Sequence, residues 1–102
     1  MAKAAKKRDI APVHPGTLLR LEFLDELSMS LAALARALGV PRTRLNDIAL
    51  ERRGITADTA YRLGRYFGTD PRFWLNLQAH YELEMLGERA ARIDGEVMPR
   101  AA

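Results

Sequence analysis

Residues 31–48 read LAALARALGVPRTRLNDI, and they predict two short helices joined by a tight turn. Ser30, just before them, is a residue type that caps helix N-termini well. Gly39 stands where the first helix should end, because glycine adopts a left-handed conformation at little cost. Pro41 suits the start of the second helix, where its missing backbone N–H is not needed. This is the outline of a helix-turn-helix.

The apolar residues of this stretch have the spacing that such a motif requires. Ala35 is small, which lets two helices cross closely, and Val40 places an aliphatic side chain in the turn. Leu45 and Ile48 lie on one face of the second helix, and we expect them to hold it against the first. The second helix should therefore show its opposite face to solvent.

Polar side chains on that opposite face are of the types that read DNA. Arginine bonds bidentately to guanine O6 and N7, and asparagine does the same to adenine N6 and N7. The candidate base-reading residues are Arg42, Thr43, Arg44 and Asn46. Arg52 and Arg53 follow in a predicted loop, where they are candidates for binding backbone phosphates. The plainer interpretation is a helical hairpin with a solvated arginine face.

Charge is distributed unevenly along the 102 residues, which are enough for one domain. Residues 1–10 carry four basic residues and one acid, a balance of +3 that equals the formal net charge of the whole chain. Residues 36–72 carry eight arginines and four acids, whereas residues 82–96 carry five acids and two arginines. The basic middle predicts that this part of the chain binds an anionic partner. The acidic end predicts a role other than binding that partner.

Helical patterns cover most of the remaining chain, and no strand pattern of useful length appears, so the predicted fold is all-α. The first helix should begin near Pro15, with Leu19, Phe23 and Leu27 forming its inward stripe. Another helix is expected at 57–67, with Thr56 as its cap.

The predicted organisation is a basic arm at 1–12, a five-helix domain at 13–92 and a frayed tail at 93–102.

A last helix, expected from residue 71 to about residue 91, is apolar on two opposite sides. The side that should seal the core consists of Phe73, Trp74, Leu77, Tyr81 and Met85. The other side has no obvious partner within so small a chain, so we expect a second copy to cover it in a homodimer. The predicted dimer interface consists of Leu75, Ala79, Leu83 and Leu86.

Several classes of protein are excluded by what the sequence lacks. There is no cysteine, which excludes disulfide scaffolds, thiolate nucleophiles and cysteine-ligated metals. His14 and His80 have no second ligand at helical spacing, so we expect no metal and no cofactor. No phosphate-binding loop or nucleophile motif appears, and we expect no enzymatic activity. No apolar run is long enough to span a membrane, and we expect a cytoplasmic protein.

The motifs together closely resemble HigA antitoxins, of the XRE-type, lambda-repressor-like helix-turn-helix family. The resemblance covers about residues 13–84. Its most distinctive strings are RGITADTA at 53–60 and FWLNLQ at 73–78, and HPG at 14–16 and ALGVPRTR at 37–44 also match. The resemblance implies a five-helix domain that dimerises, represses its own operon by binding operator DNA, and neutralises a HigB toxin, a RelE-like ribonuclease that acts on messenger RNA.

Two positions depart from the family pattern. Leu31 stands where members usually carry a glutamine that supports DNA contacts. Glu51 replaces a glycine that ends the recognition helix, so we expect this helix to run a turn longer and to place negative charge near the DNA-binding loop. Both departures bear on which operator is bound.

Two further functional interpretations remain open from the sequence. One is a solitary XRE-type repressor that has no toxin partner. The other is a protein-interaction module whose helix-turn-helix no longer binds DNA.

For a basic toxin, two acidic patches are candidate docking surfaces: one consists of Glu22, Asp25 and Glu26, and the other of Glu82, Glu84 and Glu88.

Overall fold

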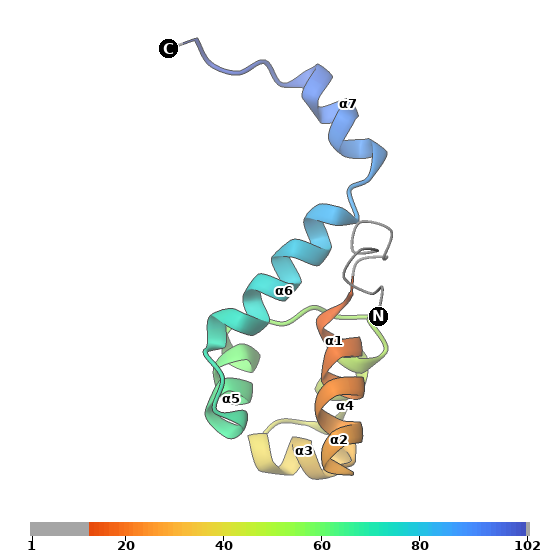
Figure 1. Ribbon diagram of the computed structural model, residues 1–102, viewed down its shortest axis with the longest axis vertical. Helices are drawn as coiled ribbons and strands as arrows, with labels where there is room; N and C mark the ends of the chain where they lie inside the picture. The colour runs from red at the N-terminus through yellow and green to blue at the C-terminus, as the bar shows by residue number, and fades with distance from the viewer. Residues whose placement is uncertain (1–12, 102) are drawn as a thin grey trace, which may run out of the picture.

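The computed structural model describes residues 13–101, and every regular element in that range is a helix. The basic arm predicted at 1–12 lies outside the described residues. The first helix runs through three consecutive segments, α1 (Pro15–Leu18), a π-helical segment (Leu19–Leu24) and α2 (Asp25–Leu27). Next come α3 (Leu31–Leu38), α4 (Arg42–Ala49), α5 (Ala57–Phe67), α6 (Pro71–Glu84) and α7 (Glu88–Glu96). The predicted all-α fold is confirmed, with one helix more than expected (Figure 1).

The π-helical segment changes which side chains of the first helix reach the core. The backbone N–H of Asp25 bonds to the carbonyl of Arg20, five residues back instead of four. Leu19 and Leu24, also five apart, are therefore both buried, whereas Leu27 is 55% exposed. The predicted inward position of Leu27 was wrong because a regular 3.6-residue period does not hold through a π-helical turn.

Glu51 ends the recognition helix α4 instead of extending it. Its backbone adopts the left-handed conformation, with φ +62°. Its N–H bonds to the carbonyl of Ile48, and the N–H of Arg52 bonds to that of Asp47 at 2.8 Å. The Glu51 carboxylate accepts a hydrogen bond from the Thr17 hydroxyl at 2.6 Å, which ties this turn to α1. The expectation of a longer helix was therefore wrong.

A single apolar core lies between the first helix, α3, α4, α5 and the start of α6. Trp74 is fully buried, and its indole N–H donates to the Thr69 hydroxyl at 2.9 Å. Phe23 packs against Trp74 and Phe67, with ring centroids 5.1 and 4.7 Å away. These aromatic contacts hold α6 across the body of the domain.

The helix predicted from residue 71 to about 91 is two helices. It breaks after Glu84, and Gly87, with φ +52°, starts a new direction before α7. Figure 1 shows α7 extending beyond the end of α6, away from the other helices, and none of its residues is buried. Asp94 belongs to α7, so the irregular chain begins later than expected.

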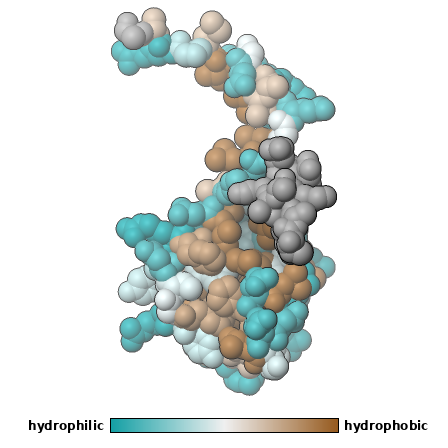
Figure 2. Space-filling view, in the orientation of Figure 1, coloured by the Kyte–Doolittle hydropathy of each residue, from teal (hydrophilic) through white to brown (hydrophobic). Residues whose placement is uncertain are grey.

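The core side predicted for this region is only partly correct. Trp74 is buried and Leu77 and Tyr81 are half-buried, but Phe73 is 39% and Met85 56% exposed. Gln78, which was not predicted on this side, is also buried. Figure 2 shows apolar surface around the junction of α6 and α7. No helix within residues 13–101 is long and apolar enough to cross a membrane.

Candidate nucleic-acid interface

The predicted helix-turn-helix is formed by α3 and α4. Ser30 caps α3 by accepting a hydrogen bond from the Ala33 N–H at 3.0 Å. Gly39 ends α3 with φ +72°, a conformation that costs little only for glycine. Ala35 and Val40 are buried at the crossing, and Leu45 is fully buried beneath α4. The packing predicted for the motif is confirmed.

The four candidate base-reading residues differ in exposure. Arg42 and Thr43, in the first turn of α4, are exposed, whereas Arg44 and Asn46 are half-buried. The Arg44 side chain is 30% exposed, and its guanidinium is ion-paired with Asp58. Arg44 and Asn46 are therefore less open to solvent than Arg42 and Thr43, and Arg44 is held against α5.

The loop between α4 and α5 carries Arg52 and Arg53, both exposed. Arg52 Nη1 lies 3.9 Å from Asp47 Oδ1 at the edge of an ion pair. Arg53 lines a shallow cavity of about 340 Å³ together with Arg44, Thr56, Asp58 and Thr59. This places the loop arginine and the helix arginine along one basic surface.

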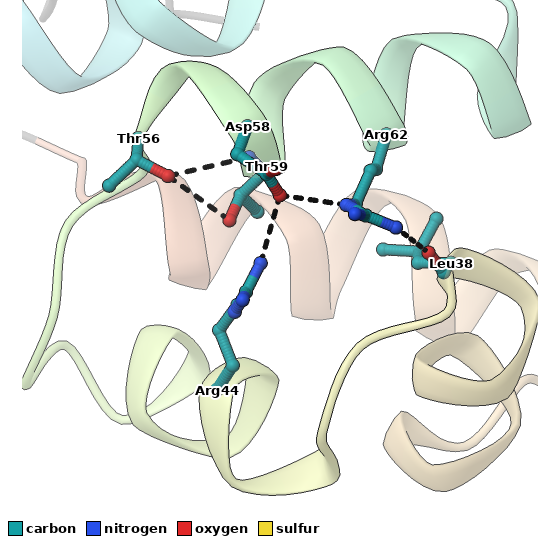
Figure 3. A network of polar contacts seen from close by, with 6 residues as sticks. All are labelled: Leu38, Arg44, Thr56, Asp58, Thr59 and Arg62. Atoms are coloured by element: carbon teal, nitrogen blue, oxygen red, sulfur yellow. Dashed lines mark hydrogen bonds and ion pairs between the residues drawn. The ribbon is translucent and has the colours of Figure 1, made fainter.

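A polar network joins the recognition helix to α5 and to the end of α3 (Figure 3). Asp58 Oδ1 accepts hydrogen bonds from Arg62 Nε at 2.7 Å and from Arg44 Nη1 at 3.0 Å. Arg62 Nη1 donates to the Leu38 carbonyl at 2.8 Å. The hydrogen bond from Arg62 is the largest of the causes that lower the pKa of Asp58 below its ordinary value, so this carboxylate is ionised at neutral pH.

Asp58 was not predicted from the sequence as a residue of this surface. Arg62 lies four residues after it on the same helix, a spacing at which two opposite charges can form an ion pair. The spacing of Asp58 and Arg62 is the signal that favours the pair. Only the fold brings Arg44, fourteen residues earlier, to the same carboxylate oxygen.

The other positions named from the sequence differ in how far they are buried. Leu31 is half-buried and packs against the core, so it adds apolar contact where the family usually has glutamine. His14 is buried at the start of α1, whereas His80 is exposed on α6. Both candidate acidic patches are exposed, although Glu82 also accepts a hydrogen bond from the Gln78 amide.

The predicted dimer residues form a partly open strip on α6 and its end. Ala79 is exposed and Leu83 is 67% exposed. Leu75 is half-buried and packs against the core of its own chain, so it is not a wholly free residue. Leu86 is half-buried at the turn before α7.

Comparison with known proteins finds one family whose pattern this chain matches and several similar proteins and solved structures. Residues 19–74 match the family described as Helix-turn-helix. The chain is 51% identical to Virulence-associated protein I of Dichelobacter nodosus, over 83% of this chain and 79% of that one. It superposes on Pseudomonas aeruginosa antitoxin HigA with the higBA promoter with a TM-score of 0.82 and 50% identity, covering 88% and 99% of the two chains. Antitoxin GraA in complex with its operator gives a TM-score of 0.84 and 45% identity, covering 91% and 95%.

Proposed function

The chain belongs to the helix-turn-helix family, in the group of HigA-type antitoxins, and on this basis we propose that it binds an operator sequence in duplex DNA, represses its own operon and neutralises a HigB-like toxin. The role is regulatory, and no catalytic step is assigned to the chain. Because operator DNA lies in the cytoplasm of bacteria such as those of its relatives, we expect the protein to act there.

One observation carries the DNA-binding part of this proposal. Buried Leu45 and Ile48 fix α4 so that its first turn, with Arg42 and Thr43, is exposed. The first residues of a recognition helix are those that reach base edges in the major groove. Two relatives of the same fold have been solved with promoter or operator DNA, which supports this assignment.

Two arginine variants test whether this surface reads DNA. Arg44→Ala should lose about 1–3 kcal/mol of binding free energy on the operator and relax one base preference, because a base contact is removed. Arg53→Ala should weaken specific and non-specific binding alike and flatten the dependence on salt, because a phosphate contact releases counterions. Binding titrations at several salt concentrations measure both. Wild-type affinity in both variants would show that DNA does not bind here.

The toxin-binding part rests on family membership and on charge. A ribonuclease that holds messenger RNA is usually basic, and both acidic patches lie on elements other than α4. We infer that toxin and operator bind different surfaces, so that one complex contains both.

Co-expression with the neighbouring reading frame tests the toxin assignment. The wild-type chain should restore growth, and charge reversal of one patch should abolish the rescue. Glu84 and Glu88 suit reversal better than Glu82, whose carboxylate bonds to buried Gln78. On the first helix the matched pair is Glu22 and Glu26, both exposed. Rescue that survives reversal of both patches would contradict electrostatic docking, and no rescue by the wild type would leave a solitary repressor.

A further inference from the structure

Asp58 is an acidic residue beside two arginines of the candidate DNA-binding surface, Arg44 and Arg53. It lies in the first turn of α5, and its side chain is 57% exposed. A carboxylate here repels the phosphates of DNA, so its presence lowers affinity for DNA of any sequence. The ion pairs that it makes are also exposed, and exposed ion pairs add little to stability. An acid in the first turn also stabilises the helix through its dipole, but that effect does not require the contact with Arg44.

The hydrogen bonds around Asp58 fix the position of its carboxylate, which in turn holds one arginine side chain. Both hydrogen bonds fall on the same oxygen, Oδ1, one from Arg62 on its own helix and one from Arg44 on α4 (Figure 3). Arg62 continues to the Leu38 carbonyl, at the end of α3. The position of the carboxylate is therefore set by both helices of the helix-turn-helix and by α5.

Arg44 is the arginine whose side chain the Asp58 carboxylate holds. Its side chain is 30% exposed, so part of the guanidinium stays open to a ligand while one nitrogen is bonded to Asp58. Arg42, two residues earlier, is exposed and has no ion pair within residues 13–101. An arginine that is already oriented loses less rotamer entropy when it binds, and its donors point in one direction.

We propose that Asp58 is a positioning residue whose carboxylate orients the Arg44 guanidinium and thereby sets how strictly one base of the operator is read. The inference rests on the proposed DNA-binding function. Asp58 acts through Arg44 and does not itself contact the base. Its negative charge reduces binding to all sequences, while its hold on Arg44 favours the matching sequence, so the net effect is specificity.

The test is selection of preferred duplexes from a random-sequence library by four full-length proteins: the wild type, Asp58→Asn, Arg44→Ala and the double variant. Asp94→Asn, an exposed acid on α7, is the control for the change in net charge. Thermal unfolding of each variant checks that binding is measured on folded protein. Titrations on the selected duplex and on a scrambled duplex then give the ratio of specific to non-specific affinity.

We expect Asp58→Asn to relax the same base position as Arg44→Ala and to lower the affinity ratio by about tenfold, within what one bidentate contact supplies. Its affinity for scrambled DNA should rise, and the double variant should lose no more discrimination than Arg44→Ala alone. The Asp94→Asn control should keep the wild-type preference.

Three results would overturn the inference, and only the third also overturns the proposed function. If the wild type selects a sequence and Asp58→Asn selects it equally strictly, Asp58 does not position Arg44, and the proposed function stands. Fully additive losses in the double variant lead to the same conclusion. If the wild type selects no sequence, the proposed function fails, and this inference fails with it.

Discussion

His14 closes the beginning of α1 and also anchors it to α6. Its Nδ1 accepts a hydrogen bond from the Gly16 N–H at 2.9 Å, and its ring packs edge-on against Tyr81 with centroids 4.9 Å apart. Burial lowers the pKa of His14 below its ordinary value of 6.5, against the smaller opposing effects of Glu51 and Glu82. The packed state therefore contains the neutral imidazole.

We predict that His14 makes the protein less stable in mild acid. The unfolded chain takes up a proton near pH 6.5 while the folded chain resists it, so the stabilisation is complete above pH 6.5 and is lost as the pH falls towards the lower folded pKa. Protonation also removes the acceptor that caps α1. Urea unfolding at a series of pH values between 8 and about 5 measures the effect.

Two variants separate His14 from the other titrating groups. His14→Asn keeps a capping oxygen but does not titrate, so it should flatten the pH dependence in this range. His80→Asn, on the exposed side of α6, should leave it unchanged. An equally steep dependence in His14→Asn would show that another group is responsible.

Residues whose role depends on local pattern were predictable, and residues whose role depends on distant partners were not. Ala35, Leu45 and Ile48 follow from helical spacing alone. Gln78 was missed because a glutamine on an apolar face has no visible reason to be buried. Its amide accepts from the Ile55 N–H at 3.0 Å, which satisfies a buried backbone group across 23 residues. Asp58 was missed because its partner Arg44 lies fourteen residues away on another helix.

The ends of the helices were harder to predict than their existence. The cap at Ser30 and the stop at Gly39 have clear residue signals. The π-helical turn at Leu19–Leu24 has none, because one long apolar helix pattern fits both hydrogen-bonding schemes. Glu51 has a side chain that disfavours a positive φ, and its turn is held by backbone hydrogen bonds to α4 and by the side-chain bond to Thr17 on another helix.

The contact between α1 and α4 gives a sharp test of the packing. Gly16 is buried, and a Cβ placed on it would overlap the backbone carbonyl of Ile48 on α4. Gly16→Ala should therefore lower the free energy of unfolding by about 2 kcal/mol or more, because backbone cannot move aside as a side chain can. The measurement is urea denaturation at neutral pH.

Gly95→Ala is the matched control, since a Cβ there meets nothing within 4 Å. Alanine favours a helix by up to about 1 kcal/mol over glycine, so stability should stay equal or rise slightly. Equal stability of Gly16→Ala and the wild type would contradict the packing of α1 on α4.

The exposed apolar residues at the end of α6 predict that the protein assembles with a second copy of itself. We predict a two-fold dimer that covers Leu83, and Leu83→Asp should yield a monomer because a buried carboxylate in the interface is unfavourable. Light scattering at micromolar concentration measures the mass. Leu27→Asp, at a leucine that is 55% exposed on the first helix, should remain a dimer. A wild-type monomer would contradict the model of assembly.

A dimer of this chain should read a specific operator through α4, and footprinting on the DNA upstream of its own gene is the decisive experiment. We expect one protected region that contains two inverted half-sites about 10 base pairs apart, because recognition helices about 34 Å apart enter successive major grooves. Protection should disappear with Arg42→Ala combined with Arg44→Ala. Uniform, sequence-independent protection, or none at concentrations where the protein is dimeric, would contradict the claim.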